Sequence, residues 1–268
     1  MKYIIISNSL WNIYNFRFNL IKELAKFGSV VIYCDSNKKG QIFKKKFPKN
    51  VLIKKLNFSS KSKNFFENLI LMFKLYLILK KEKPDCLFSF TLKPNLYCGL
   101  LNNFFKFSFF PTISGLGTAR NKGGILFFLV KFLMKYAFLN NSNIFVHNKN
   151  EKFFLKNLGI NKNKITQVNG SGINLNKFKP LNFSKKITNN YLFIGRLIAD
   201  KGIYELISAF KIFNDYKKNS RLTLAIMIDE DNETSINLKE LEKIIFGSNI
   251  ILKVNVRNIK KLLSNHGC

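Results

Sequence analysis

Two cations and two glycines follow an apolar run late in the chain, and their types and spacing suit the binding of a diphosphate. The run at residues 191–194 is followed by Gly195 and Arg196, and a helical pattern begins at Lys201 and Gly202. A helix N-terminus offers free N–H groups and a positive dipole end, and an arginine fork binds phosphate oxygens. The segment therefore predicts a phosphate site at a strand-to-helix turn. Two solvated cations on a surface loop are the alternative in a chain so rich in lysine.

Arg196 and Lys201 are the residues that we expect to be catalytic. When a diphosphate departs from a sugar, negative charge grows on its oxygens, and fixed cations in a dry site stabilise that charge. Glu205 lies four residues after Lys201, and we expect an exposed ion pair between them on the helix. The chain has two histidines, His147 and His266, and neither has partners at metal-ligand or triad spacing. We therefore predict no metal site and no cofactor, and we expect His147 to line the core or a cleft.

Five segments, taken in chain order, carry a resemblance to a known enzyme family. They are LWNIYNFR (10–17), SFTLKPN (89–95), ISGLG (113–117), GSGIN (170–174) and GRLIADKG (195–202). Together they resemble the retaining, nucleotide-sugar-dependent glycosyltransferases of family 4, in the branch that acts on lipid-linked oligosaccharide precursors. The resemblance covers residues 1 to about 262 and implies the GT-B fold, in which two Rossmann-like domains face each other across a cleft.

The resemblance also implies which residues bind the two substrates. The donor-binding residues would be Gly195, Arg196, Lys201, Gly170, Ser171, Gly172 and Gly115. The acceptor-binding residues would be Asn15, Arg17, Lys93 and Gly117. Glycines let the backbone approach a ligand closely, although a tight turn or a hinge would need them too.

The predicted acceptor residues lie where helices are expected to begin. We expect Asn15 and Arg17 to open the first helix, and Lys93 to open another just before Pro94, because proline suits the first helical turn. Both places follow parallel strands, whose carboxyl ends bind ligands in open α/β sheets. Arg17 could equally be a surface residue whose stem packs on an aromatic neighbour in the same helix.

The charge of the chain indicates an anionic partner. Lys and Arg number 45 against 15 Asp and Glu, which gives a net charge of +30. Nucleic acid, an acidic membrane and phosphorylated small molecules all fit, although a codon bias toward A and T would also enrich lysine. A basic nucleic-acid- or membrane-binding α/β protein without catalysis is thus the alternative function. We expect no nucleic acid as partner, because the aromatic residues fall inside strand and helix patterns. A nucleotide-sugar epimerase would need additional acid–base side chains, which we do not find.

The sequence favours a cytoplasmic protein that touches the inner face of the cytoplasmic membrane. The cysteines form no C-x-x-C pair, which suits free thiols in a reducing compartment. No apolar stretch approaches the ~20 residues that span a bilayer, and the first apolar run is too short for a signal peptide. The expected helix 122–140 carries Lys131 and Lys135 among apolar residues, which suits the headgroup region of an anionic membrane. A helix buried against a sheet would look similar.

Apolar runs alternate with helical patterns along the whole chain, which is typical of an α/β protein with parallel sheets. Strands are expected near 3–7, 30–34, 51–57, 86–90, 109–113, 143–147, 165–168, 191–195, 222–228 and 249–253. Helices are expected near 15–27, 62–82, 94–104, 122–140, 149–158, 202–217, 236–246 and 257–264. We divide the chain into an N-terminal acceptor-side domain (1–178), a linker (179–189) and a nucleotide-sugar-binding domain (190–268).

The second domain is expected to be incomplete. It is shorter than the roughly 100–150 residues of a typical domain, and the glutamate pair of the resembled family is missing before Cys268. We therefore expect a C-terminally truncated chain whose own catalytic turnover is in question. The predicted activity is transfer of a hexose or N-acetylhexosamine from a UDP-sugar onto a lipid-linked or polysaccharide precursor of cell-envelope glycans such as lipopolysaccharide, O-antigen or capsule.

Overall fold

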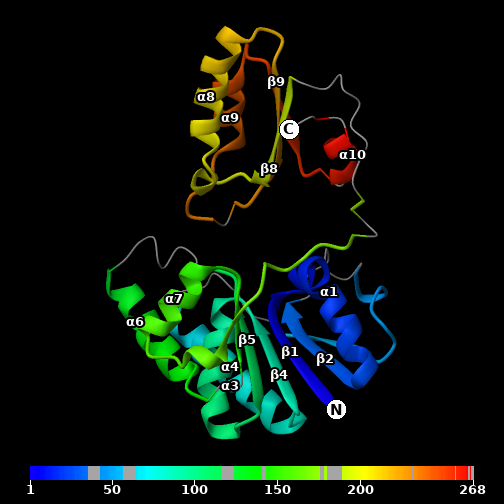
Figure 1. Ribbon diagram of the computed structural model, residues 1–268, viewed down its shortest axis with the longest axis vertical. Helices are drawn as coiled ribbons and strands as arrows, with labels where there is room; N and C mark the ends of the chain where they lie inside the picture. The colour runs from blue at the N-terminus through cyan, green and yellow to red at the C-terminus, as the bar shows by residue number, and fades with distance from the viewer. Residues whose placement is uncertain are drawn as a thin grey trace. The chain divides into compact units, whose positions relative to one another are not determined.

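The computed structural model describes residues 1–35, 43–56, 64–115, 124–140, 143–175, 178–179, 189–230, 232–256, 258–264 and 266. The chain divides into two units, Met1–Asn174 and Leu175–Cys268 (Figure 1). The predicted linker at 179–189 lies outside the described residues except at its two ends.

The first unit contains a parallel sheet of seven strands in the order β3-β2-β1-β4-β5-β6-β7. The strands are β1 (Lys2–Ser9), β2 (Ser29–Asp35), β3 (Val51–Lys55), β4 (Cys86–Phe90), β5 (Ser108–Ile113), β6 (Ile144–Val146) and β7 (Ile165–Gln167). The strand order reverses between β1 and β4, and ligands of open α/β sheets bind at such a switch point. The predicted α/β class is confirmed.

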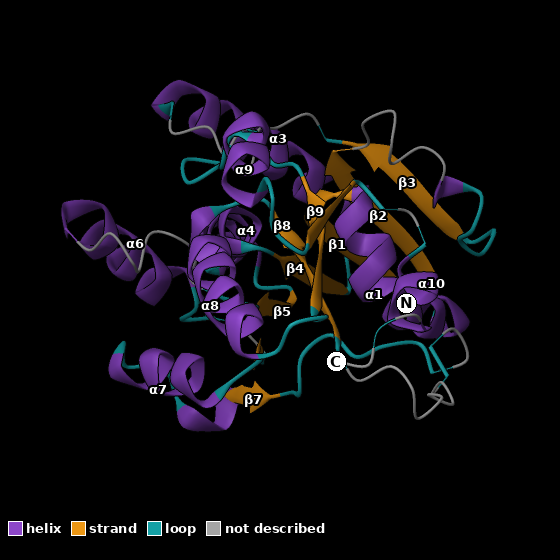
Figure 2. Cartoon of the chain, turned by 90° about the horizontal axis from the view of Figure 1, so that it is seen from above, coloured by secondary structure: helices purple, strands orange, loops and turns teal. Residues whose placement is uncertain are grey.

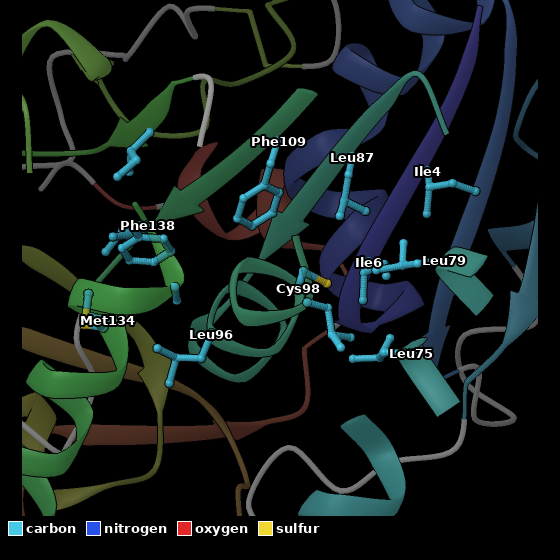
Figure 3. Close-up of a cluster of buried hydrophobic side chains, with 14 of the residues drawn as sticks. Ile4, Ile6, Leu75, Leu79, Leu87, Leu96, Cys98, Phe109, Met134 and Phe138 are labelled. Atoms are coloured by element: carbon cyan, nitrogen blue, oxygen red, sulfur yellow. The ribbon is translucent and has the colours of Figure 1, made fainter. Parts of the chain in front are cut away.

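Helices cover both faces of this sheet. They are α1 (Leu10–Phe27), α3 (Phe65–Glu82), α4 (Leu92–Phe105), α6 (Gly124–Ala137) and α7 (Lys149–Asn157). Side chains alternate along β1, so that Ile4 and Ile6 pack under α3, α4 and α6 (Figure 3), whereas Tyr3 and Ile5 pack under α1. Figure 2 shows α1 and α4 on opposite sides of the strands. The two faces thus present different helices to solvent.

The second unit has a parallel sheet of three strands in the order β10-β9-β8. Its elements are β8 (Asn190–Arg196), a 3-10 turn η2 (Ala199–Lys201), α8 (Ile203–Tyr216), β9 (Arg221–Met227), α9 (Leu238–Ile245), β10 (Ile250–Val254) and α10 (Ile259–Ser264). An apolar core of its own, which includes Ile207, Leu224 and Leu241, holds this unit together. Figure 1 shows α8 and α9 side by side against β8 and β9.

The first helix begins earlier than predicted. Helix α1 starts at Leu10, directly after β1, because the Ser9 hydroxyl caps it and accepts a hydrogen bond from the Asn12 N–H at 3.2 Å. The prediction that Asn15 and Arg17 open this helix is therefore wrong. The aromatic and asparagine residues of the first turn have modest helix propensity, which hid the start of the helix in the sequence.

In the part of the chain that the structure describes, no helix combines the length and the apolar character needed to cross a bilayer.

Candidate functional site

Arg17 is the centre of a polar cluster in the first unit. Its Nη1 donates a hydrogen bond to the Ser171 hydroxyl at 3.0 Å, and its guanidinium carbon lies 4.6 Å from the centre of the Phe90 ring. Phe90 ends β4 and Ser171 follows β7, so segments far apart in sequence meet beyond the carboxyl ends of the strands. Burial lowers the pKa of Arg17 to about 10, which still leaves the guanidinium charged at neutral pH.

Three polar atoms of this region are buried without a hydrogen-bond partner among the described residues. They are Arg17 Nε, Thr91 Oγ1 and His147 Nε2. Burial, together with the charge of Arg17, lowers the pKa of His147 and keeps its imidazole neutral at neutral pH. Buried polar atoms in folded proteins nearly always have a partner, so a ligand with hydroxyl or phosphate oxygens would satisfy this cluster.

The backbone around the cluster is held in uncommon conformations. Thr91, which precedes α4, has a φ of 75°, a strained value for a β-branched residue. Gly170 and Gly172 flank Ser171 with φ values of 74° and 69°, which only glycine adopts without cost. Such strain concentrates at ligand sites, where the surrounding fold holds it in place.

Arg196 occupies the corresponding place in the second unit, at the carboxyl end of β8. Its Nη1 donates to Asp229 Oδ2 at 2.9 Å, and Asp229 follows the neighbouring strand β9. The Arg196 side chain is 44% exposed, so this ion pair lies at the surface of the unit. The guanidinium is therefore oriented by a carboxylate but remains open to a ligand.

Lys201 ends the 3-10 turn that leads into α8. Its side chain is exposed, and it has neither a hydrogen bond nor an ion pair with any described residue. Gly202 caps the following helix with a φ of 68° and without a side-chain hydrogen bond, so α8 begins at Ile203, just after the start that the sequence suggested at Lys201 and Gly202. A free ammonium and a helix N-terminus without a side-chain cap thus lie together, as an anion site requires.

A family model described as "Glycosyl transferase 4-like" matches residues 5–148, more than half of the chain. The chain belongs to this family. The predicted resemblance to family 4 glycosyltransferases is thereby confirmed, and with it the type of enzyme.

Solved structures show the same fold at low sequence identity. Anabaena HepE, solved in complex with UDP, is 12% identical, with a TM-score of 0.69 over 99% of this chain and 72% of HepE. The lipopolysaccharide outer core galactosyltransferase WaaB is 13% identical, with a TM-score of 0.59 over 98% of this chain and 70% of WaaB. A UDP-GlcNAc 2-epimerase from Neisseria meningitidis, bound to UDP-GlcNAc, is 14% identical, with a TM-score of 0.64 over 98% of this chain and 74% of the epimerase. No curated protein matches this chain.

The predicted acceptor residues of this glycosyltransferase do not gather in one place. Asn15 is exposed and donates to the Trp11 carbonyl oxygen at 2.9 Å. It lies two positions before Arg17 in the helix, which turns it to another face. Lys93 begins α4 as predicted, but its Nζ donates to Asn68 Oδ1 of α3 at 3.1 Å. Burial lowers the pKa of Lys93. Helix α4 covers the opposite face of the sheet from α1, so Lys93 and Arg17 lie on different sides.

The glycine predictions have mixed outcomes. Gly117 lies outside the described residues. Gly115 has a φ of 123°, and no atom of the described residues lies within 4 Å of the place of a Cβ there. A Cβ on Gly195 would lie 2.9 Å from the Phe193 ring, so packing within β8 already explains a glycine at this position. Of the predicted donor glycines, Gly170 and Gly172 shape the loop that presents Ser171 to Arg17.

The predicted ion pair between Lys201 and Glu205 is wrong. Lys201 lies in the 3-10 turn before α8, so the two residues do not share one helix. The Glu205 carboxylate instead folds back toward Gly202, 3.7 Å from the place of a Cβ there.

Sequence reasoning missed Asp229 and Thr91 and gave His147 no binding role. Asp229 has a visible signal, because an acidic residue just after an apolar strand must lie at the carboxyl edge of the sheet. The φ of Thr91 has no such signal. Among the described residues, no group of three or more His, Cys, Asp and Glu side chains could hold a metal ion.

Proposed function

We propose that this glycosyltransferase transfers a hexose or N-acetylhexosamine from a UDP-sugar onto a lipid-linked or polysaccharide precursor of the cell envelope. Membership of the family supports sugar transfer. HepE structures with UDP and UDP-glucose support a UDP-sugar donor, and WaaB, a lipopolysaccharide galactosyltransferase, supports an envelope glycan as acceptor.

The observation that carries the proposal is the Arg17 cluster. It combines a partly buried guanidinium, whose Nε is fully buried and which has no carboxylate partner among the described residues, with unsatisfied atoms of Thr91 and His147. A buried cation of this kind is costly unless an anion pairs with it. A diphosphate on the acceptor lipid would supply that anion, while Ser171 and His147 would contact neighbouring hydroxyl or phosphate oxygens.

Arg196 and Lys201 would act on the donor. The bond from the anomeric carbon to the departing diphosphate breaks, and a bond to the acceptor oxygen forms on the same face of the sugar. The acceptor hydroxyl passes its proton to the departing phosphate oxygen, so no protein base is needed. The guanidinium and the ammonium would stabilise the charge that grows on this phosphate, and no metal ion is required for it.

The acceptor places the enzyme at a membrane in this proposal. A lipid-linked precursor is made at the inner face of the cytoplasmic membrane, where anionic headgroups attract a chain with a net charge of +30. The enzyme would then be cytoplasmic and peripheral to the membrane.

The test is transfer from labelled UDP-hexoses and UDP-N-acetylhexosamines to undecaprenyl-diphosphate-linked sugars. We expect transfer with one donor, and transfer weakened by about 10–100-fold in the Arg17→Gln variant. Lys22→Gln is the matched control, because Lys22 is an exposed cation on the same helix. Saturable binding of a UDP-sugar without transfer to any lipid-linked or polysaccharide acceptor would count against the proposed acceptor. No binding of any UDP-sugar would reject the proposed donor.

A further inference from the structure

Helix α3 is apolar on the side that faces away from the sheet. Its inner side packs in the core through Leu71, Leu75 and Leu79. Its outer side carries a second apolar row with large exposed fractions, from 47% to 73%. We call this row the α3 stripe: Phe66, Leu69, Ile70, Phe73 and Leu77. An exposed apolar row of this size beside polar residues is typical of an interaction surface, so the α3 stripe indicates a docking site.

Lysines border the stripe at its C-terminal end and along one flank. Lys80 continues the row after Phe73 and Leu77 at helical spacing, Lys74 and Lys81 lie together on one flank, and all three are exposed. Beside the stripe, a hollow of about 370 Å³ is lined by Lys55 and Lys74 together with apolar side chains. An apolar row with ammonium groups along its edge is the composition of a helix that lies in the headgroup region of an anionic bilayer.

Helix α6 repeats this arrangement on the same face of the sheet. Phe128, Leu129, Phe132 and Tyr136 are exposed by 43% to 72%, while Met134 and Ala137 are buried in the shared core. Lys135 is exposed beside the row. Figure 1 shows α3, α4 and α6 grouped on one side of the sheet, and α4 contacts both of the other helices. Two lysine-bordered apolar rows thus belong to one face of the first unit.

We propose that the α3 stripe, with the exposed row of α6, docks this unit on an anionic lipid surface. Charge complementarity selects this occupant over a second copy of the chain, because two copies at +30 each would bring their lysines together. The apolar side chains enter the boundary between headgroups and acyl chains, and the lysines contact lipid phosphates. The proposal rests on the proposed function for its partner, the anionic membrane, and adds the surface of the first unit that docks there.

The first experiment measures flotation of the full chain with vesicles of phosphatidylcholine alone or mixed with phosphatidylglycerol. No sugar donor or acceptor is added, so a failed transfer assay leaves this result standing. We expect binding to the mixed vesicles, lowered by salt, and at least about tenfold weaker binding to phosphatidylcholine alone. Equal affinity for both vesicle types would overturn the anionic part of the proposal.

The second experiment removes the stripe. The variant Phe66→Gln, Ile70→Gln, Phe73→Gln should weaken binding to the mixed vesicles by more than about tenfold, because each lost side chain no longer enters the bilayer. Glutamine has a good helix propensity, so we expect α3 to remain helical in this variant. Far-UV circular dichroism and the thermal midpoint check this. Unchanged vesicle binding by the folded variant would overturn the proposal.

A matched control removes as much exposed apolar surface from the second unit. Ile212→Gln, Tyr216→Gln, Phe246→Gln changes three side chains that are exposed by 61% to 89%. Vesicle binding like that of the unchanged chain supports the proposal, and a loss equal to that of the stripe variant would overturn it.

The last measurement separates lipid from self-association. Sedimentation equilibrium without vesicles should find the same monomeric mass for the chain and the stripe variant. The contrary result is a dimer for the unchanged chain, a monomer for the stripe variant, and no vesicle binding by either protein. It would assign the stripe to a second copy and overturn the proposal.

Discussion

The two units each place an arginine at the carboxyl edge of a parallel sheet, and they treat its charge in opposite ways. Arg17 is largely buried, stacks on Phe90 and bonds only the neutral hydroxyl of Ser171 among the described residues. Arg196 is 44% exposed and paired with Asp229. A buried cation without a counter-charge costs stability, whereas a paired surface cation costs little. Under the proposed function, Arg17 is kept for a ligand at the expense of stability, and Arg196 is held in position for one.

Removal of the donor cations should have the largest effect on catalysis. We expect Arg196→Gln and Lys201→Gln each to lower kcat by about 10²–10³, because each removes a fixed charge from the departing diphosphate. The thermal midpoint should hardly change, since the Arg196 pair is a surface ion pair and Lys201 is exposed.

Steady-state kinetics with the best UDP-sugar checks this expectation. Lys217→Gln and Lys218→Gln are the matched controls, because both remove exposed lysines from the same unit after the end of α8. A kcat within twofold of the unchanged enzyme for both site variants would show that the diphosphate binds elsewhere.

The Arg17→Gln variant tests the other side of the comparison. We expect kcat/KM for the acceptor to fall by about 10–100-fold, the value of a lost hydrogen bond to a charged group, while the KM for the donor changes little. The same substitution should leave the thermal midpoint equal or raise it, because it removes a desolvated charge. A variant that loses stability and acceptor binding together would mean that Arg17 has a structural role.

The α/β order of this chain could be predicted because its signal is local. The apolar runs around Ile5, Ile32 and Leu224 are each long enough for a buried strand, and helical patterns separate them. The contacts that build the candidate site are not local. Arg17 and Ser171 are 154 residues apart, and no pattern in either segment announces the other.

The errors of the sequence interpretation come from helix starts. Because α1 begins five residues before the predicted position, Asn15 and Arg17 fall in a later turn and on different faces. The same cause separates Lys201 from Glu205. We expected the helix to include Lys201, but this lysine ends a 3-10 turn and α8 begins after it. The cap at Ser9 sets the start of α1, and the φ of Gly202 sets the start of α8. Both depend on backbone geometry that the spacing of residue types in the sequence does not reveal.

Glu82 shows how the first unit treats a charge that serves stability. Its carboxylate is 8% exposed, pairs with Lys2 at 2.7 Å and Lys54 at 2.6 Å, and accepts a hydrogen bond from Tyr33. These bonds, of which the one from Lys2 has the largest effect, lower the pKa of Glu82 from 4.5 to about 2. The stabilisation is therefore present above about pH 4.5 and is lost as the pH falls toward 2.

We expect Glu82→Gln to lower the free energy of unfolding at pH 7 by about 1–2 kcal/mol, because solvent screens the two half-exposed lysines. Urea denaturation at neutral and acidic pH measures this. The variant should also lose stability less steeply than the unchanged chain between pH 4.5 and pH 2. Glu23→Gln, which breaks an exposed pair with Lys26, is the control and should change stability by less than about 0.5 kcal/mol. Parallel pH profiles for both variants would show that the Glu82 cluster is not a stabilising one.

The smallest expected effect is a change in the titration of His147 when Arg17 is replaced. Burial and then the charge of Arg17 lower the pKa of His147, so its neutral form contributes stability above the pKa of the unfolded chain, and that stability is lost as the pH falls through the folded value. Arg17→Gln removes the charge but not the burial. The pKa should therefore rise while it stays below 6.5.

Histidine ring resonances followed by NMR against pH measure this shift. His266 lies in the other unit and provides the internal reference in the same spectra, and Lys22→Gln provides the control for a charge lost from the same helix. If His147 Nε2 accepts a hydrogen bond from the acceptor, kcat/KM should fall on the acid side of the same pKa. A titration that is identical with and without Arg17 would mean that its charge does not reach the ring, and the Arg17 cluster would then not act as one site.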